Sequence, residues 1–227
     1  MWEATVKHVV KRGRALSAAP GQAPGQVGIA MGGPCRLKTP GRLGAVAPAS
    51  TDNFQVRPFI FDGVEWQSCE QAYQAYKFAD AARREQIRRI KPNVNESDST
   101  HGMRCWSEGQ HGRVRPDWDA VKVEVMLRVN RAKYMQHGDL QEALLSTGDV
   151  PIVGAPSTSW SLPDGSTVNW SAWNGKIQLL IREELRESNS PVRTALAAEF
   201  AEYMRRFGGP QLPLPGTSEE SDAQQQP

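Results

Sequence analysis

A glutamate, a glutamine and a lysine follow one another along the stretch SCEQAYQAYKF, residues 68–78. Glu70, Gln74 and Lys77 are four and three positions apart, so a helix would place their side chains along one stripe. In the first turn of a helix, the partial positive charge of the amino end favours an ionised carboxylate. The stripe could line a cleft, with Glu70 as an acid, a base or an electrostatic stabiliser and Lys77 as an anion contact. The alternative is a solvated helix face with weak pairing along it, because charged stripes are usually exposed.

The helix that must position this stripe has a recognisable beginning. Ser68 followed three residues later by Gln71 forms a capping-box pattern, which predicts a helix over residues 68–80. Residues 59–61 and 64–66 flank an Asp-Gly pair, as the two strands of a hairpin do. Further helices are expected at residues 82–91, 117–136, 139–146 and 176–187, and a further short strand at residues 150–153.

The composition is that of a globular protein. The chain has 227 residues, of which 39% are hydrophobic and 23% are charged, enough for one domain with a core and tails. The net charge of +2 is too balanced to indicate nucleic acid, and no apolar run approaches the roughly 18 residues of a membrane helix. The three cysteines are far apart and show no ligand spacing, so we expect no metal site and no disulfide framework. We predict a cytoplasmic protein without a membrane partner.

The chain divides into four regions by composition. Residues 1–50 are basic and rich in Gly, Pro and Ala, which predicts a disordered segment. An organelle transit peptide within residues 1–45 is the alternative, because the start of the chain is amphipathic and poor in acids. The folded domain is expected over residues 51–190, a C-terminal helix over 191–208 and a disordered polar tail over 209–227. We predict an α+β fold, a mostly helical single domain with a small β-hairpin and a short sheet.

Several motifs in order resemble the signature of the NADAR family, named for its links to NAD and ADP-ribose metabolism. The segment PFIFDGVEWQSCEQAYQAYKF, residues 58–78, is similar to the family's strand, DG turn, aromatic return strand and S-x-E-x-x-Y-Q-A-x-K helix. Residues 114–149 resemble its R-P-D-W-D-x-V-K-x-x-V-M helix, R-A-K-[FY] motif and T-G-D turn. Residues 52–54 resemble the end of its S-N-F motif, and Gly175-Lys176 resembles its closing L-G-K helix. An ordered series of motifs is far more specific than any one of them.

The resemblance implies N-glycosidase chemistry, the hydrolysis of the C1′–N bond of a ribose-phosphate or ADP-ribose conjugate. It suggests riboflavin-pathway intermediates and ADP-ribosylated guanine as substrates, so the expected partner is a small phosphoribosyl or ADP-ribosyl molecule or an ADP-ribosylated nucleic acid. Breaking this bond builds positive charge on the ribose, which a carboxylate can stabilise. Glu70 matches the family's catalytic glutamate, and Lys77 and Lys133 are the expected phosphate contacts. No cofactor is expected.

The remaining site residues are expected to bind the substrate, since a flat heterocycle is held well by aromatic rings. They are Asn53, Phe54, Tyr73, Gln74, Trp118, Trp160 and Asp164. Core packing is the alternative for Trp118, and also for the tryptophans at positions 160, 170 and 173.

The chain departs from the family pattern after the T-G-D turn. Gly154 and Ser157 occupy the positions of a family glutamate and aspartate, and Ser161 replaces the glycine after the tryptophan. Asp164 is the candidate replacement carboxylate. The alternative function is therefore a non-catalytic module that binds ADP-ribose or other NAD-derived ligands.

Overall fold

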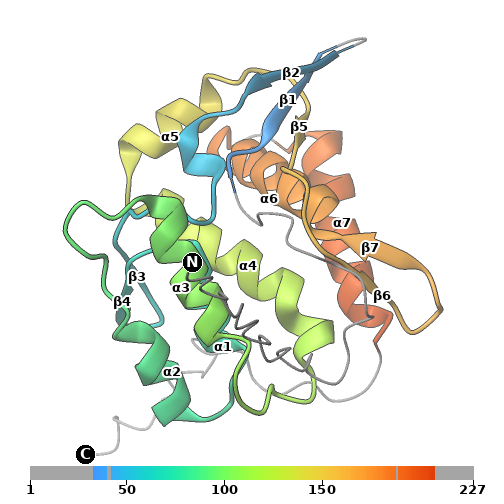
Figure 1. Ribbon diagram of the computed structural model, residues 1–227. Coiled ribbons are helices and arrows are strands. Elements are labelled where there is room, and N and C mark those ends of the chain that lie inside the picture. Colours follow the sequence, from blue (N-terminus) through green and yellow to red (C-terminus); the bar gives the residue numbers. More distant parts are fainter. Residues whose placement is uncertain (1–32, 40–41, 188, 208–227) are drawn as a thin grey trace, which may run out of the picture.

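The computed structural model describes residues 33–39, 42–187 and 189–207 (Figure 1). The helices of this part are α1 Cys69–Tyr76, α2 Ala81–Arg88, α3 Asp98–Glu108, α4 Trp118–Met135, α5 Gly138–Leu145, α6 Trp170–Leu185 and α7 Pro191–Arg205. Its strands are β1 Arg36–Thr39, β2 Arg42–Val46, β3 Phe59–Phe61, β4 Val64–Trp66, β5 Ile152–Val153, β6 Ser159–Ser161 and β7 Thr167–Asn169. A short 3-10 helix covers Ala49–Thr51. The predicted fold class, a mostly helical α+β domain, is confirmed.

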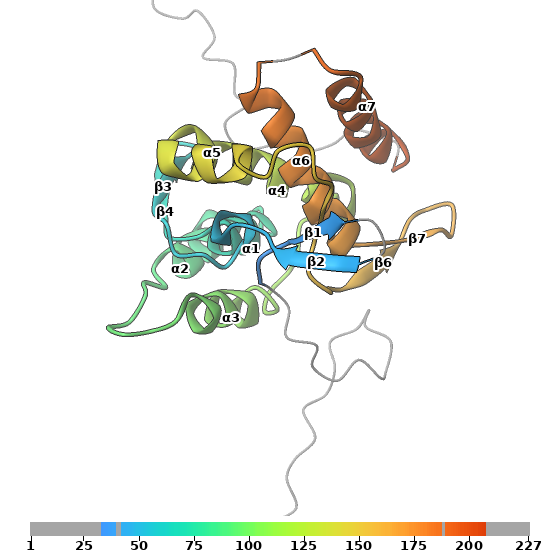
Figure 2. The ribbon, with the colours of Figure 1, turned by 90° about the horizontal axis from the view of Figure 1, so that it is seen from above.

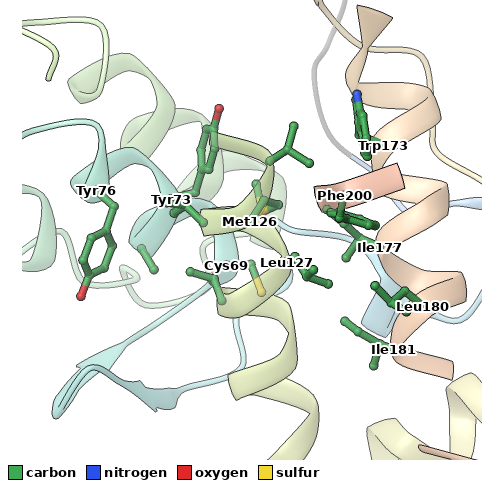
Figure 3. Close-up of a cluster of buried hydrophobic side chains, with 14 of the residues drawn as sticks. Cys69, Tyr73, Tyr76, Met126, Leu127, Trp173, Ile177, Leu180, Ile181 and Phe200 are labelled. Carbon is green, nitrogen blue, oxygen red and sulfur yellow. The ribbon is translucent and has the colours of Figure 1, made fainter. Parts of the chain in front are cut away.

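Helix α4 is the central element and packs against α1, α5, α6, α7 and β3 (Figures 1 and 2). Apolar side chains cover most of its circumference, as expected for a buried helix. Figure 3 shows Met126 and Leu127 of α4 facing Ile177, Leu180 and Ile181 of α6. Burial of each such side chain stabilises the fold by about 1.5–3 kcal/mol. This apolar layer fixes α1 and α6 on either side of α4.

A hairpin leads the chain into α1. Strands β3 and β4 pair antiparallel, with Phe59 opposite Trp66, and the two turn residues Asp62 and Gly63 have φ values of 57° and 70°. An Asp-Gly pair suits this turn because both central residues of such a tight hairpin need a positive φ. The sequence therefore predicts both the hairpin and the place where α1 begins.

The N-terminal boundary of the domain differs from the prediction. Strands β1 and β2 lie inside the region predicted to be disordered, and they form a three-stranded sheet in the order β2-β1-β5. Cys35 and Ala47, which face each other at the open end of the β1–β2 pair, are 1% and 3% exposed. Composition averaged over fifty residues hides two short strands whose backbones pair with each other. Residues 1–32 and 208–227, with the predicted disordered ends and most of the predicted transit peptide, lie outside the described part of the chain.

Two helices begin at places that the sequence pattern does not predict. Helix α3 falls in a stretch for which we expect no element, and the side chain of Ser97 caps it by accepting from Thr100 N at 3.1 Å. Helix α6 begins at Trp170 rather than at residue 176, because Asn169 Oδ1 accepts from Ala172 N at 2.8 Å. Trp160 therefore lies on the β6–β7 hairpin, and Trp170 and Trp173 lie in the first turn of α6. The predicted C-terminal helix is present as α7.

Candidate functional site

Glu70 lies in the first turn of α1, which is tied down on both sides. Ser68 Oγ accepts from Gln71 N at 3.1 Å, as the capping pattern predicts. Gln71 Oε1 accepts from Gln67 N at 2.8 Å, one residue before the N-cap residue whose N–H donates in a capping box. Glu70 N donates to Asn53 O at 2.8 Å, so the loop before the hairpin also holds this turn. The backbone that carries the carboxylate is fixed by these bonds.

The stripe of polar side chains on α1 is buried rather than solvated. Glu70 is 6% exposed and Gln74 is 2% exposed. Gln74 Nε2 donates to Glu70 Oε1 at 2.5 Å, and Lys77 Nζ lies 3.4 Å from Gly109 O at the end of α3. The interpretation of the stripe as an exposed helix face is therefore wrong, because α3 covers it. Burial of polar groups costs free energy unless they are hydrogen-bonded, and these bonds lower that cost for Glu70, Gln74 and Lys77.

Burial changes the acidity of both charged groups in the stripe. Desolvation raises the pKa of Glu70 from 4.5 to about 7, although the Gln74 hydrogen bond and the Lys77 charge lower it. Desolvation also lowers the pKa of Lys77 from 10.5 to about 8, against the pull of Glu70, and Lys122 lowers it further. A carboxyl group with a pKa near neutral pH can both give and take a proton, as acid–base catalysis requires.

Lys122 of α4 is a cation of the site that the sequence analysis does not single out. It is 6% exposed, its Nζ pairs with Asp119 Oδ1 at 2.9 Å, and it lies 4.0 Å from the centroid of the Trp160 ring. Its charge acts on Lys77, so the ammonium groups of α1 and α4 face the same region. Its spacing of four residues from Trp118, and its place in the V-K part of the motif, are the signals that could have found it.

Aromatic rings continue the site away from Glu70. The Tyr73 ring is 4.9 Å from Trp118 and 5.4 Å from Trp170, and Trp170 is 5.1 Å from Trp160, each distance measured between ring centroids. Three of the expected binding residues, Tyr73, Trp118 and Trp160, thus belong to one group, to which Trp170 is added. Trp173 instead packs in the core against Phe200, with centroids 5.1 Å apart.

Two hollows of the described surface lie away from Glu70. The larger, about 530 Å³, lies between the β3–β4 hairpin and α2, and the smaller, about 210 Å³, is formed by α4, α5 and α6. Neither of them is lined by Glu70. The half-buried members of the site are Lys77, Trp160 and Trp170, so a ligand that reaches Glu70 must come past these side chains.

This chain is similar in sequence to proteins of one known family. The family model of the NADAR domain matches residues 40–186. The chain belongs to the NADAR family. N-glycosidase YbiA of Shigella flexneri is 30% identical over 133 residues, which are 59% of this chain and 79% of that protein. N-glycosidase Npun_R5314 of Nostoc punctiforme is 30% identical over 137 residues, 59% of this chain and 83% of that protein.

Two further proteins are similar to this chain. The riboflavin biosynthesis protein VVA0006 of Vibrio vulnificus is 32% identical over 156 residues, 69% of this chain and 40% of that protein. The NMR structure of the E. coli protein YbiA matches at 30% identity with a TM-score of 0.43, over 68% of this chain and 81% of that chain. The sequence matches carry the assignment to the NADAR family.

Lys133 lacks the exposure to solvent that a phosphate contact needs. Its side chain is fully buried, and its Nζ donates to Ser50 O at 2.6 Å and lies 5.1 Å from the centroid of the Tyr134 ring. With 0% exposure it has no surface to offer to a phosphate, so the prediction is wrong. The lysine instead joins α4 to the 3-10 helix near the start of the NADAR domain.

Asp164 does not replace a lost carboxylate of the site. It lies exposed in the turn of the β6–β7 hairpin, where its Oδ1 accepts from Ser166 N at 2.9 Å and from Ser166 Oγ at 2.6 Å. Its second oxygen is 3.6 Å from Arg206. These contacts place Asp164 in a surface turn rather than beside Glu70.

Asn53 and Phe54 are packed against other elements of the NADAR domain. Asn53 Oδ1 accepts from Asn130 of α4 at 2.9 Å, and its Nδ2 donates to Asn174 of α6 at 3.1 Å. Phe54 is 5% exposed and packs on Gly102 of α3, where a Cβ would lie 2.4 Å from its ring. Both residues hold neighbouring elements around α1, and their predicted contact with substrate remains a prediction.

The close approach of Gly109 to Gln74 predicts a sensitive position. A Cβ at Gly109 would lie 2.0 Å from Gln74 Oε1 and 2.9 Å from Gln74 Cβ. We expect Gly109→Ala to push the Gln74 amide away from Glu70 and to cost about 1–3 kcal/mol of stability through overpacking. Denaturant unfolding measures this, with Gly138→Ala as the control, because a Cβ at Gly138 meets nothing within 4 Å. Equal stability of the two variants would contradict the packing described here.

The described part of the NADAR domain lacks both a metal-binding cluster and a membrane-spanning helix. It contains no group of three or more His, Cys, Asp or Glu side chains arranged to hold a metal ion. None of its helices combines the length and the apolar character needed to cross a membrane. The predicted cytoplasmic location stays a prediction.

Proposed function

We propose that this chain is an N-glycosidase that hydrolyses the C1′–N bond of a ribose-phosphate or ADP-ribose conjugate. The observation that carries the proposal is the buried Glu70 carboxylate, held by Gln74 beside the Lys77 ammonium and flanked by aromatic rings. The relatives named N-glycosidases support this reaction type, and the Vibrio protein named for riboflavin biosynthesis supports a riboflavin intermediate as one substrate.

The reaction breaks the C1′–N bond and forms a C1′–O bond with water. As the bond breaks, positive charge develops on the ribose ring, and a fixed carboxylate beside C1′ stabilises it. Glu70 in its ionised form also accepts a proton from the attacking water and later releases it to solvent, and the leaving nitrogen takes up one proton from solvent. Lys77 and Lys122 supply the positive charge that a substrate phosphate needs, and the rings of Trp160 and Trp170 offer a surface for the base.

A panel of conjugates tests the proposal. The purified chain is incubated with phosphoribosylated riboflavin intermediates and with DNA that carries ADP-ribosylated guanine. Release of the free base or of the sugar phosphate is then followed by chromatography. We expect turnover of at least one conjugate. If every conjugate stays uncleaved at high protein concentration, the proposed reaction is refuted.

The rate of hydrolysis should depend on pH with a maximum between the two pKa values of the site. The ionised form of Glu70 is needed, so the rate should rise as the pH increases through about 7. The protonated form of Lys77 is also needed, so the rate should fall as the pH increases beyond about 8. Because the ionisations of Glu70 and Lys77 affect each other, the two apparent pKa values of the rate profile describe the pair rather than either residue alone. A profile of kcat/KM that stays flat from pH 5 to pH 9 would contradict these assignments.

Gly154 favours a second candidate, a module that binds ADP-ribose without cleaving it. The position where the family carries a glutamate has no space for a side chain, because a Cβ there would lie 2.5 Å from Ser171 O. A site with one carboxylate could bind the ligand and lack a partner for the leaving group. Calorimetry with ADP-ribose separates the two candidates: binding without turnover of any conjugate supports the module, whereas turnover supports the hydrolase.

A further inference from the structure

Helix α7 contacts the site although it lies beyond the residues that match the NADAR domain. The match ends at residue 186, and α7 spans Pro191–Arg205. Ser190 Oγ accepts from Arg193 N at 3.1 Å, which fixes where the helix begins. The helix packs against α4 and α6 (Figures 1 and 2). Its position therefore brings residues from outside the matched domain to the amino end of α4.

Tyr203 of α7 makes the contact through its hydroxyl group. The residue is 2% exposed, and its hydroxyl accepts from Trp160 Nε1 at 3.1 Å and donates to Asp119 O at 2.5 Å. The Tyr203 ring meets Trp173 edge-on, with centroids 5.0 Å apart. A buried phenol with both a donor and an acceptor bond has one fixed orientation.

The two partners of this hydroxyl both belong to the site. Trp160 carries the Lys122 ammonium 4.0 Å from its ring centroid and lies 5.1 Å from Trp170. Asp119 follows Trp118 in the first turn of α4, and its carboxylate pairs with Lys122 at 2.9 Å. The Tyr203 hydroxyl thus fixes two parts of the site. One is the Trp160 indole, on which a base could stack, and the other is the first turn of α4, whose Asp119 pairs with Lys122.

We propose that Tyr203 is a positioning residue of the active site, which orients Trp160 and the first turn of α4 for binding of the substrate's base and phosphate. This inference rests on the proposed function. Contacts to the base are present in both the ground state and the transition state, so their loss should raise KM and leave kcat almost unchanged. This effect differs from that expected for a group that acts at the reacting bond.

The test compares Tyr203→Phe with the matched control Tyr76→Phe. Tyr76 is also buried, at 4% exposure, and its hydroxyl donates to Asp62 Oδ2 at 3.0 Å. Figure 3 shows the Tyr76 side chain pointing away from that of Tyr73, so its hydroxyl lies on another side of α1. Thermal unfolding of both variants shows that each is folded before the comparison is made.

Two readouts separate positioning from a general loss of structure. In nitrogen-15 NMR spectra, the indole N–H of Trp160, assigned with Trp160→Phe, should shift and exchange with solvent about tenfold faster in Tyr203→Phe only. KM should rise about tenfold in the same variant while kcat changes by less than about threefold. Tyr76→Phe should leave all of these quantities at the wild-type values.

Two results count directly against the inference. An unchanged Trp160 N–H signal, or a fall in kcat at constant KM, would overturn the positioning role. If the wild type hydrolyses no conjugate, the proposed reaction has failed, and the dissociation constant for ADP-ribose takes the place of KM. A tenfold weaker affinity of Tyr203→Phe would then still support the role of Tyr203. Absence of both turnover and ADP-ribose binding in the wild type would overturn both proposals.

Discussion

Replacing Glu70 by glutamine should lower kcat by a factor of about 10²–10⁴ while KM changes little. Glutamine keeps the shape of the side chain and can still pair with Gln74, but it carries no charge and accepts no proton. The charge that develops on the ribose would then lose its stabilising partner in the transition state only. Steady-state kinetics on the best conjugate of the panel measures the effect.

The control for this prediction is Glu65→Gln, which removes an exposed carboxylate from β4 and should leave kcat unchanged. Stability provides a second check. The folded state raises the pKa of Glu70 from 4.5 to about 7, so it favours the protonated form. The contribution of this group to stability is therefore complete below pH 4.5 and is lost as the pH rises to about 7. Glu70→Gln should lack this loss and be at least as stable as the wild type above pH 7.

Placing a glutamate at position 154, where the resemblance to the NADAR family suggests one, should destabilise this chain rather than improve its activity. A Cβ at Gly154 would lie 2.5 Å from Ser171 O and 3.0 Å from Asn174 Cβ. Gly154 also donates to Ser171 O at 2.9 Å and accepts from Ser171 Oγ at 2.6 Å, so the two backbones cannot separate without losing these bonds. Gly154→Ala should cost about 1–3 kcal/mol of unfolding free energy. Gly154→Glu should cost more than about 3 kcal/mol, because a carboxylate would also be buried.

Gly138→Glu is the matched control, since Gly138 is the first residue of α5 and a Cβ there meets no atom within 4 Å. A carboxylate in the first turn of a helix is favourable by about 0.3–1 kcal/mol, so this variant should keep or gain stability. Urea unfolding of the three variants gives the comparison. A Gly154→Glu protein as stable as the wild type would show that β5 and α6 are not packed as closely as described.

The start of α1 could be predicted from the sequence because it depends on local chemistry. Ser68 and the Asp62-Gly63 turn act on neighbouring residues, and each has its predicted role in the structure. Burial of the polar stripe could not be predicted in the same way. It depends on Gly109 at the end of α3, thirty-five residues after Gln74. The sequence pattern of α1 does not indicate that Gly109 packs against Gln74.

The errors in the predicted site have physical causes. Lys133 is predicted as a phosphate contact because a phosphate needs a cationic donor, but its ammonium group donates to Ser50 O of the same chain instead. Lys122 lies in the V-K part of the family motif, but its burial against the Trp160 ring depends on tertiary contact. Strands β1 and β2 were missed because pairing between strands is not encoded in the composition of either one.

The central claim is that the Glu70 carboxylate lies beside the anomeric carbon of a bound substrate. A crystal structure of the Glu70→Gln variant with an uncleaved ribose-phosphate conjugate tests this claim most directly. We predict that C1′ lies about 3–3.5 Å from the side chain at position 70, with the base against Trp160 or Trp170. A conjugate bound instead in the 530 Å³ hollow between the β3–β4 hairpin and α2 would contradict the account.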